Sequence, residues 1–194
     1  MAITTPTPAT GLLTYEEYMA EGVVKERYDI IEGVRTFMTA PTWEHQAVIL
    51  TIAKILDRYS EQTGSGKAMI APLDILIRRA PRLQVRQPEA FYITHGRLAQ
   101  GGGPPRRGPL EIAPELVVEI ISDTERRRTI DGKTADYITI GVQEEWIVRS
   151  EQRTVEVVQL TPDGPVSIAT YDETQKLQSQ FFPDLTVAVA DLFK

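Results

Sequence analysis

The sequence predicts a mixed α/β fold (α/β or α+β), with a central mixed β-sheet flanked by helices. Short apolar runs typical of strands alternate along the chain with segments of helical periodicity. The length of 194 residues, with 42% apolar and 25% charged side chains, is ordinary for one globular domain. No internal repeat is apparent. These observations predict one sheet with helices packed on it.

The first elements follow from capping signals. We expect a flexible N-terminus over residues 1–11, rich in Thr and Pro, and a single domain over 12–194. Thr14 and Glu17 have the spacing of a capping box. They predict a short helix over 15–20.

A hairpin and a long helix come next. A turn at Glu32-Gly33 between two apolar segments predicts a hairpin over 28–38. Pro41-Thr42 is typical of a helix start, and apolar side chains recur every three or four residues as far as Tyr59. Gly64 and the residues after it should end this helix.

The rest of the chain is expected to supply most of the sheet. The segment 96–109 contains three successive glycines and two prolines, so it should be a loop, long enough to be a lid or binding loop. Thr161-Pro-Asp-Gly should turn a second hairpin. Strands are predicted at 68–77, 89–93, 116–121, 145–148, 154–160 and 166–171, and a helix at about 125–140.

Composition excludes several classes of site. The chain has no cysteine, which rules out disulfides, thiolate zinc sites, iron–sulfur clusters and cysteine nucleophiles. Its two histidines cannot form an all-His metal site. No apolar run approaches the ~20 residues that span a bilayer, and the N-terminus lacks a signal pattern. We therefore expect a soluble cytoplasmic protein that does not associate with membranes.

The charge is unevenly distributed. A formal net charge of −6 argues against nonspecific coating of nucleic acid. The middle of the chain, residues 71–133, nevertheless carries 11 basic and 8 acidic side chains, whereas both ends are acidic. The arginines of residues 71–133 occur in small clusters, and any single cluster can be explained as solvated surface. Together they make an anionic ligand plausible.

Glu119 interrupts a continuous apolar run, Leu116-Val-Val-Glu-Ile-Ile. Such a run is typical of a central strand covered on both faces, where an unpaired carboxylate costs several kcal/mol to desolvate. Alternatively the strand is exposed on one face and Glu119 points to water. Val117 and Ile121 share its side, which favours the buried interpretation.

Lys133 raises the same question on a helix. Ile130, Lys133, Tyr137 and Ile140 lie along one helical stripe, so the lysine should point at the sheet. A lysine that snorkels at the rim of the core is the alternative. The short connection from Glu119 to this helix brings both groups to the same end of the sheet.

Two further acids complete the candidate set. Glu89 follows a proline immediately before an apolar strand, although it could equally be an exposed charge at a strand end. Glu44 lies in the first turn of the long helix, where the helix dipole alone favours an acid. His45 carries little weight. The sequence contains no phosphate-loop, dinucleotide-binding or nucleophile-elbow motif. The candidate site is therefore three acids and a lysine, and carboxylates are suitable ligands for a hard divalent ion.

Several short motifs, in this order and spacing over about residues 13–193, resemble the PD-(D/E)XK (restriction-endonuclease-like) nucleases, and among them the Uma-two family of putative restriction endonucleases. The motifs are Tyr28-Asp-Ile-Ile-Glu-Gly33, Pro41-Thr-Trp-Glu-His-Gln46, Ala71-Pro-Leu-Asp-Ile75, Gln87-Pro-Glu89, Ala113-Pro-Glu-Leu-Val-Val-Glu-Ile-Ile-Ser122, Asp131-Gly-Lys133 with Tyr137, and Gly141-Val-Gln-Glu-Glu-Trp-Ile-Val148. The resemblance implies a restriction-endonuclease-like core. Glu89 stands where that family normally has Asp. Ile121 occupies the usual lysine position, and the resemblance implies that Lys133 supplies the ammonium instead.

The resulting expectation is an endonuclease that hydrolyses DNA with Mg²⁺ or Mn²⁺. Glu89 and Glu119 would hold the ion, with the Ile120 carbonyl as a further ligand and Glu44 acting directly or through water. Lys133 would orient or deprotonate the attacking water and offset charge in the transition state.

Partners follow from the same expectation. Cutting both strands of a duplex with one site per chain favours a homodimer. The main alternative is a catalytically inactive nuclease fold that serves as a DNA-binding or protein-interaction module. A glycoside hydrolase is a weaker alternative, because aromatic residues are few. The residues expected to contact nucleic acid are Arg106, Arg107, Arg126 and Arg127.

Overall fold

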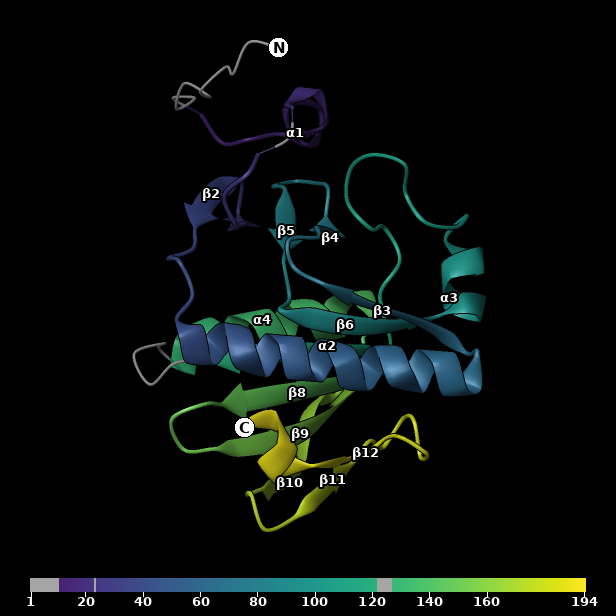
Figure 1. Cartoon of the computed structure of the whole chain (residues 1–194). Helices are drawn as coiled ribbons and strands as arrows, with labels where there is room; N and C mark the ends of the chain where they lie inside the picture. Colours follow the sequence, from purple (N-terminus) through teal and green to yellow (C-terminus); the bar gives the residue numbers. More distant parts are fainter. Residues whose placement is uncertain (1–10, 23, 122–126) are drawn as a thin grey trace.

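The computed structural model describes residues 11–22, 24–121 and 127–194 (Figure 1). The expected flexible N-terminus lies outside these residues except for Gly11. The elements are α1 (Tyr15–Ala20), β1 (Tyr28–Ile31), β2 (Val34–Phe37), α2 (Trp43–Thr63), β3 (Gly66–Ile70), β4 (Ile75–Arg78), β5 (Gln84–Arg86), β6 (Ala90–Thr94), α3 (His95–Gln100), β7 (Leu116–Ile121), α4 (Arg127–Ile140), β8 (Glu144–Arg149), β9 (Thr154–Thr161), β10 (Gly164–Tyr171), β11 (Lys176–Gln178), β12 (Thr186–Ala188) and α5 (Val189–Leu192).

The central sheet has six strands in the order β10-β9-β8-β7-β6-β3. β7 and β8 are parallel, and the other neighbouring pairs are antiparallel. α4 makes the crossover between the two parallel strands, as a parallel connection requires. The predicted central mixed sheet with flanking helices is therefore confirmed.

The two long helices cover opposite faces of this sheet (Figure 1). On one face Ile52 and Leu56 of α2 pack against side chains that include Trp146 of β8. On the other face Tyr137 of α4 belongs to a second cluster that includes Phe91 of β6. Alternate residues of each central strand enter the two clusters, so both faces are dry, and every residue of β7 is buried.

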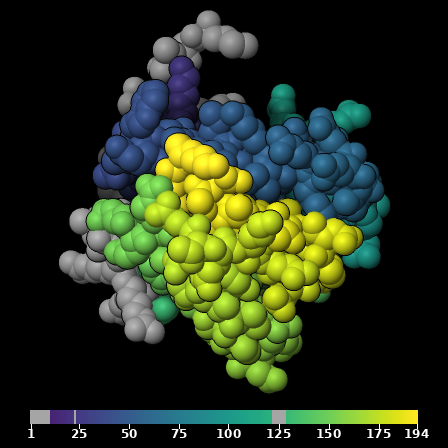
Figure 2. Space-filling model, turned by 60° about the horizontal axis from the view of Figure 1, so that its bottom comes forward, coloured from purple at the N-terminus to yellow at the C-terminus, as the bar shows by residue number. Residues whose placement is uncertain are grey.

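The C-terminal segment completes the core on the α2 face. Leu177, Phe182 and Leu192 are buried there together with the helix and the sheet. Figure 2 shows this yellow segment lying beside the blue surface of α2. No sequence signal had predicted β11, β12 or α5.

The predicted strand 68–77 is wrong in one respect, because it is two strands in two sheets. β3 pairs with β6 in the central sheet, whereas β4 belongs to a separate antiparallel sheet of order β2-β1-β5-β4. Pro72 lies between them, and a proline cannot donate a ladder hydrogen bond. The expectation of one sheet therefore becomes a six-stranded and a four-stranded sheet, with a small β11–β12 pair.

The segment 96–109 begins as the end of α3 and is irregular from Gly101 onward, as its glycines and prolines predict. It leaves the sheet after Thr94 and the chain returns at Leu116, at the strand ends opposite Glu89 and Glu119. The loop is thus joined to the central sheet at the end away from those acids, and Leu110, just after it, hydrogen-bonds to Asp74 and Leu76 beside the four-stranded sheet. Among the helices in the described residues, none is long and apolar enough to cross a membrane.

Candidate functional site

The register of β6 and β7 brings Glu89 and Glu119 together. The last ladder pair of these antiparallel strands is Ala90 with Val118. One residue further along, Glu89 therefore lies opposite Glu119, and residues directly opposite each other share a face of the sheet. That face is the one covered by α4. The sequence had predicted both acids separately, and the antiparallel pairing unites them.

Glu119 is 1% exposed and both of its carboxylate oxygens accept hydrogen bonds. Lys133 Nζ donates to Oε2 at 2.8 Å, and Tyr137 Oη donates to Oε1 at 2.5 Å. Burial raises the pKa of Glu119 although Lys133 and Tyr137 oppose the shift, and the negative charge of Glu89 adds to the increase. The buried interpretation of this acid is confirmed.

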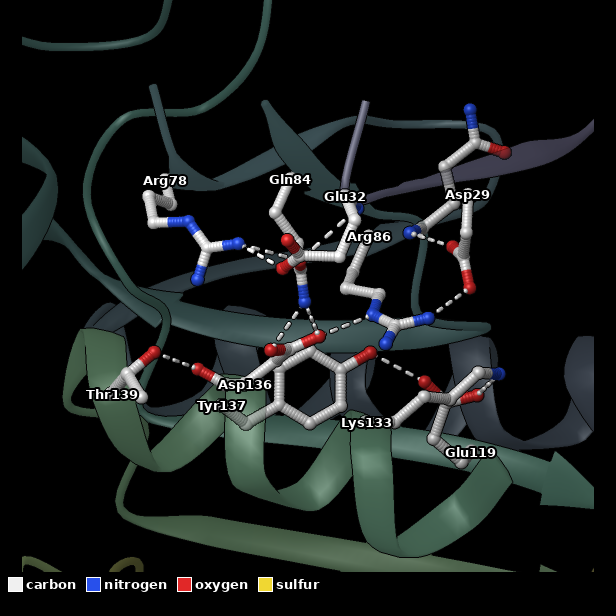
Figure 3. Close-up of polar contacts among 11 residues, drawn as sticks. Asp29, Glu32, Arg78, Gln84, Arg86, Glu119, Lys133, Asp136, Tyr137 and Thr139 are labelled. Carbon is white, nitrogen blue, oxygen red and sulfur yellow. Dashed lines mark hydrogen bonds and ion pairs between the residues drawn. The ribbon is translucent and has the colours of Figure 1, made fainter. Parts of the chain in front are cut away.

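Lys133 and Tyr137 reach Glu119 because they lie on the inner stripe of α4 (Figure 3). Both side chains are buried, and Ile130 and Ile140 on the same stripe are partly buried against the core. The predicted stripe therefore holds, and Lys133 points inward at the sheet. A snorkelling lysine at the rim is not what the structure shows.

Glu89 is also buried but has different partners. Its Oε2 accepts a hydrogen bond from Arg27 Nη1 at 2.6 Å and lies 3.3 Å from His45 Nε2. Burial alone would raise the pKa of Glu89, but His45 and the Arg27 guanidinium outweigh it and lower that pKa. The two acids therefore have pKa values shifted in opposite directions, which is common at functional sites.

Glu145 is a further buried acid on the same face, which the sequence analysis did not select. It is opposite Val117 in the parallel β7–β8 ladder, two residues along the strand from the level of Glu119. Its Oε2 accepts from Thr134 Oγ1 at 2.7 Å, while its buried Oε1 has no hydrogen-bond partner among the described residues. Burial raises the pKa of Glu145 to about 8.

An ion network joins α4 to the four-stranded sheet beside this site (Figure 3). Arg86 of β5 donates to Asp29 of β1 at 2.8 Å and to Asp136 of α4 at 2.7 Å. Gln84 also donates to both oxygens of Asp136, at 2.6 and 2.5 Å. Because Asp136 precedes Tyr137, this network anchors the turn of α4 that carries the tyrosine.

The other predicted residues are more dispersed. Glu44 lies in the first turn of α2 with an exposed side chain, whereas its neighbour His45 contacts Glu89. Ile120 of β7 lies two residues past Val118, the last β7 residue that pairs with β6, and it is opposite Val148 of β8.

The four candidate arginines do not form one described cluster. Arg106 and Arg107 are exposed in the loop after α3. Arg126 lies outside the described residues, and Arg127 is the first residue of α4, with a side chain that the structure does not describe. The sequence analysis missed Arg27, for which no local pattern gave a signal. It gave His45 too little weight.

The donor set suits one kind of metal. Across the residues that the structure describes, no group of three His, Asp or Glu side chains is arranged to hold an ion. Mg²⁺ does not need such a cage, since it is usually bound by one or two carboxylates and keeps several waters. Glu89 and Glu119 provide two facing carboxylates, so the site fits a hard, partly hydrated cation.

Comparisons with known proteins identify the family and a structure with the same fold. The family Uma2, described as "Putative restriction endonuclease", matches residues 15–190. A crystal structure of a putative nuclease belonging to DUF820 from Anabaena variabilis ATCC 29413 has a TM-score of 0.74 with this chain. The two sequences are 16% identical, and the match covers 93% of this chain and 97% of that chain, so it shows a shared fold. A search of curated proteins finds no match. The expected restriction-endonuclease-like core is thus confirmed.

Proposed function

The chain belongs to the Uma2 family of restriction-endonuclease-like proteins, and from this premise we propose that it is an endonuclease that hydrolyses DNA phosphodiester bonds with Mg²⁺ or Mn²⁺. The observation that carries the proposal is the facing pair Glu89 and Glu119 with Lys133 at 2.8 Å from Glu119. Two carboxylates and an ammonium are the groups needed to hold a divalent ion beside a phosphate and a water.

Each residue has a distinct proposed role. Glu89 and Glu119 would hold the ion, with the Ile120 carbonyl as a further ligand. When bound, a divalent ion activates water and neutralises negative charge on the scissile phosphate. Lys133 would orient or deprotonate the attacking water and offset charge that develops on the phosphate. Glu44, on the exposed first turn of α2, would assist through water.

Tyr137 would act as a positioning residue. Its hydroxyl holds one oxygen of Glu119, while Lys133 holds the other. A carboxylate fixed at both oxygens presents a defined geometry to an ion, and such supporting hydrogen bonds tune metal affinity.

Cleavage assays provide the direct test. Plasmid and single-stranded DNA should be cut by wild type in Mg²⁺ or Mn²⁺, and Lys133→Met should lower the rate by about a hundredfold or more. Glu119→Gln should also abolish detectable cutting. Glu115→Gln is the matched control, because Glu115 is a buried acid just before β7 at the opposite end of the strand. Equal cleavage by wild type and Glu119→Gln would mean that the assigned chemistry is wrong.

One observation favours a second candidate, a noncatalytic DNA-binding or partner-binding module. Both acids already have a cationic partner, Arg27 on Glu89 and Lys133 on Glu119, so the site is charge-compensated without an ion. Calorimetry with Mn²⁺ separates the two functions. Binding that is lost in Glu119→Gln supports the nuclease, whereas no binding at millimolar Mn²⁺ supports the module.

A further inference from the structure

Arg27 forms hydrogen bonds with the side chain of Glu89 and with the backbone two residues earlier in the chain. Its Nη1 donates to Glu89 Oε2 at 2.6 Å, and its Nη2 donates to the backbone carbonyl of Gln87 at 3.1 Å. The third donor, Nε, is buried and has no hydrogen-bond partner among the residues that the structure describes. The N–H of Nε is therefore available to another acceptor, next to an acid assigned to metal binding.

A divalent cation on Glu89 would compete with Arg27 for the same carboxylate oxygen. Lys133 is in an equivalent position on Glu119, but its side chain is only 9% exposed and it lies on a long, packed helix. The Arg27 side chain is 20% exposed, and Arg27 lies directly before β1, outside the helices and strands. Arg27 is thus the cation of the two that can move with less disturbance of the core.

We propose that Arg27 is an exchange residue: it neutralises Glu89 in the metal-free protein and transfers to a substrate phosphate when a divalent cation takes its place. This inference rests on the proposed function. A guanidinium is suited to both partners, because its planar fork binds carboxylate and phosphate with the same pair of parallel hydrogen bonds. After the exchange, Nη1 can bind a phosphate oxygen in parallel with the second N–H of Nη2, and the unpartnered Nε remains as a further donor.

The transfer makes metal binding and phosphate binding cooperative. Without an ion, the Glu89 carboxylate competes with the phosphate for Arg27. The same carboxylate also repels the phosphate, because both are negatively charged. With an ion in place, the carboxylate charge is neutralised and the guanidinium is released beside the phosphate. Arg27 therefore weakens binding of the ion alone and strengthens binding of the phosphate once the ion is present.

Metal binding is measured first, by calorimetry with Mn²⁺ in the absence of DNA. Arg27→Met should bind Mn²⁺ about tenfold more tightly than wild type, because a charge-assisted hydrogen bond no longer has to break. Arg97→Met is the matched control. Arg97 lies 3.6 Å from buried Glu115 at the other end of the sheet, and the exposed side-chain fractions of the pair, 21% and 6%, are close to the 20% and 7% of Arg27 and Glu89. The Mn²⁺ affinity of Arg97→Met should equal that of wild type.

Phosphate binding is measured next, by fluorescence anisotropy of a labelled DNA duplex in Ca²⁺, a hard ion that takes the same oxygen ligands. Duplex affinity should fall about tenfold in Arg27→Met. Arg27→Lys keeps the charge but not the fork, so it should leave Mn²⁺ affinity near that of wild type and still weaken duplex binding. This second variant decides the matter if Arg27→Met does not fold.

The outcomes separate this inference from the proposed function. If wild type binds neither Mn²⁺ nor duplex, the proposed function fails and the exchange fails with it. If wild type binds both, and Arg27→Met binds Mn²⁺ no more tightly or Arg27→Lys binds duplex as wild type does, the exchange alone is overturned. Tighter Mn²⁺ binding together with weaker duplex binding supports it.

Discussion

Glu145 carries a buried carboxyl group whose environment favours the neutral form. Burial raises its pKa from the usual 4.5 to about 8; Thr134 and Lys133 oppose the increase, whereas Glu119 and Glu156 add to it. Between these two pH values the unfolded chain loses the proton and the folded chain keeps it. The folded state then binds more protons than the unfolded state, so the free energy of unfolding must fall as pH rises.

The first prediction is that Glu145→Gln becomes more stable relative to wild type as pH rises from 5 to 9. The amide cannot ionise, so the variant avoids a cost of up to about 4 kcal/mol when the buried carboxyl loses its proton. Urea unfolding at pH 5, 7 and 9 measures the difference. Glu156→Gln is the comparison: Glu156 is a partly exposed residue of the neighbouring β9 paired with Arg149, and it contributes least to the pKa shift of Glu145, so its replacement should change the pH dependence far less. A constant difference for Glu145→Gln across pH would contradict the prediction.

Residues of the site could be predicted where a local pattern was broken. Glu119 interrupts an apolar strand and Lys133 interrupts an apolar helical stripe, and both are buried as those patterns predicted. Arg27 and His45 break no pattern, since each lies at the edge of an element where charged residues are ordinary. Their contact with Glu89 spans 62 residues for Arg27 and 44 for His45, so it depends on tertiary structure.

At the scale of elements, Arg86 connects the four-stranded sheet with α4. It is 3% exposed and lies between Asp29 and Asp136, two acids that it neutralises together. The network reaches the candidate site because Asp136 adjoins Tyr137, whose hydroxyl holds Glu119. Removal of the Arg86 guanidinium would leave the carboxylates of Asp29 and Asp136 without their shared cation, at a site where little water can reach them to compensate the charge.

The second prediction is that Arg86→Met lowers the free energy of unfolding by about 3–5 kcal/mol, the usual cost of leaving a buried charge uncompensated. Chemical unfolding followed by circular dichroism gives the value. The matched control is Arg78→Met, because Arg78 pairs with Glu32 at the surface, where an ion pair contributes about 1 kcal/mol or less. Equal losses in the two variants would show that the buried network has no special role in stability.

Elements were predictable where the signal was local. The capping box of α1, the strand β7 and the β9–β10 hairpin have the expected positions, because caps, continuous apolar runs and turn residues act over a few neighbours. The division of 68–77 between two sheets was not predicted. The apolar pattern of this segment fits a strand on either side of Pro72, and the choice of partner strand depends on distant residues.

At the scale of the whole molecule, the third prediction is a homodimer. Each chain offers one pair of facing acids and one inward lysine, which under the proposed function would cut one strand of a duplex. Two copies related by a twofold axis would address both strands, as closed symmetric assemblies do. Light scattering at micromolar concentration should give twice the chain mass. A monomer mass would contradict the prediction and favour a protein that nicks one strand.

The last prediction concerns the binding of DNA, under the proposed function, by a chain with a net negative charge. The net charge is −6, so attraction to phosphate must come from local basic segments, and Arg106 and Arg107 are two exposed arginines in succession. If both contact phosphates, Arg106→Ala with Arg107→Ala should weaken binding and flatten the slope of log K against log salt by roughly two. The control is Arg78→Ala with Arg79→Ala. These two arginines already pair with Glu32 and Glu111, so they are less available to bind phosphates and displace counterions from the DNA. Their replacement should therefore change the salt slope less.

The position of the loop makes this measurement informative about the path of the DNA. Close to these arginines in the chain, Leu110 pairs with Asp74 and Leu76 of the four-stranded sheet region, and Gly108 packs against Met19 of α1. Contact by the arginines therefore requires a duplex that extends from the acids over the four-stranded sheet toward α1. A duplex too short to reach the loop should bind with the same salt slope in wild type and in the double variant, whereas a longer duplex should separate them. An unchanged slope with the longer duplex would leave the loop as a spacer and place the DNA along another surface.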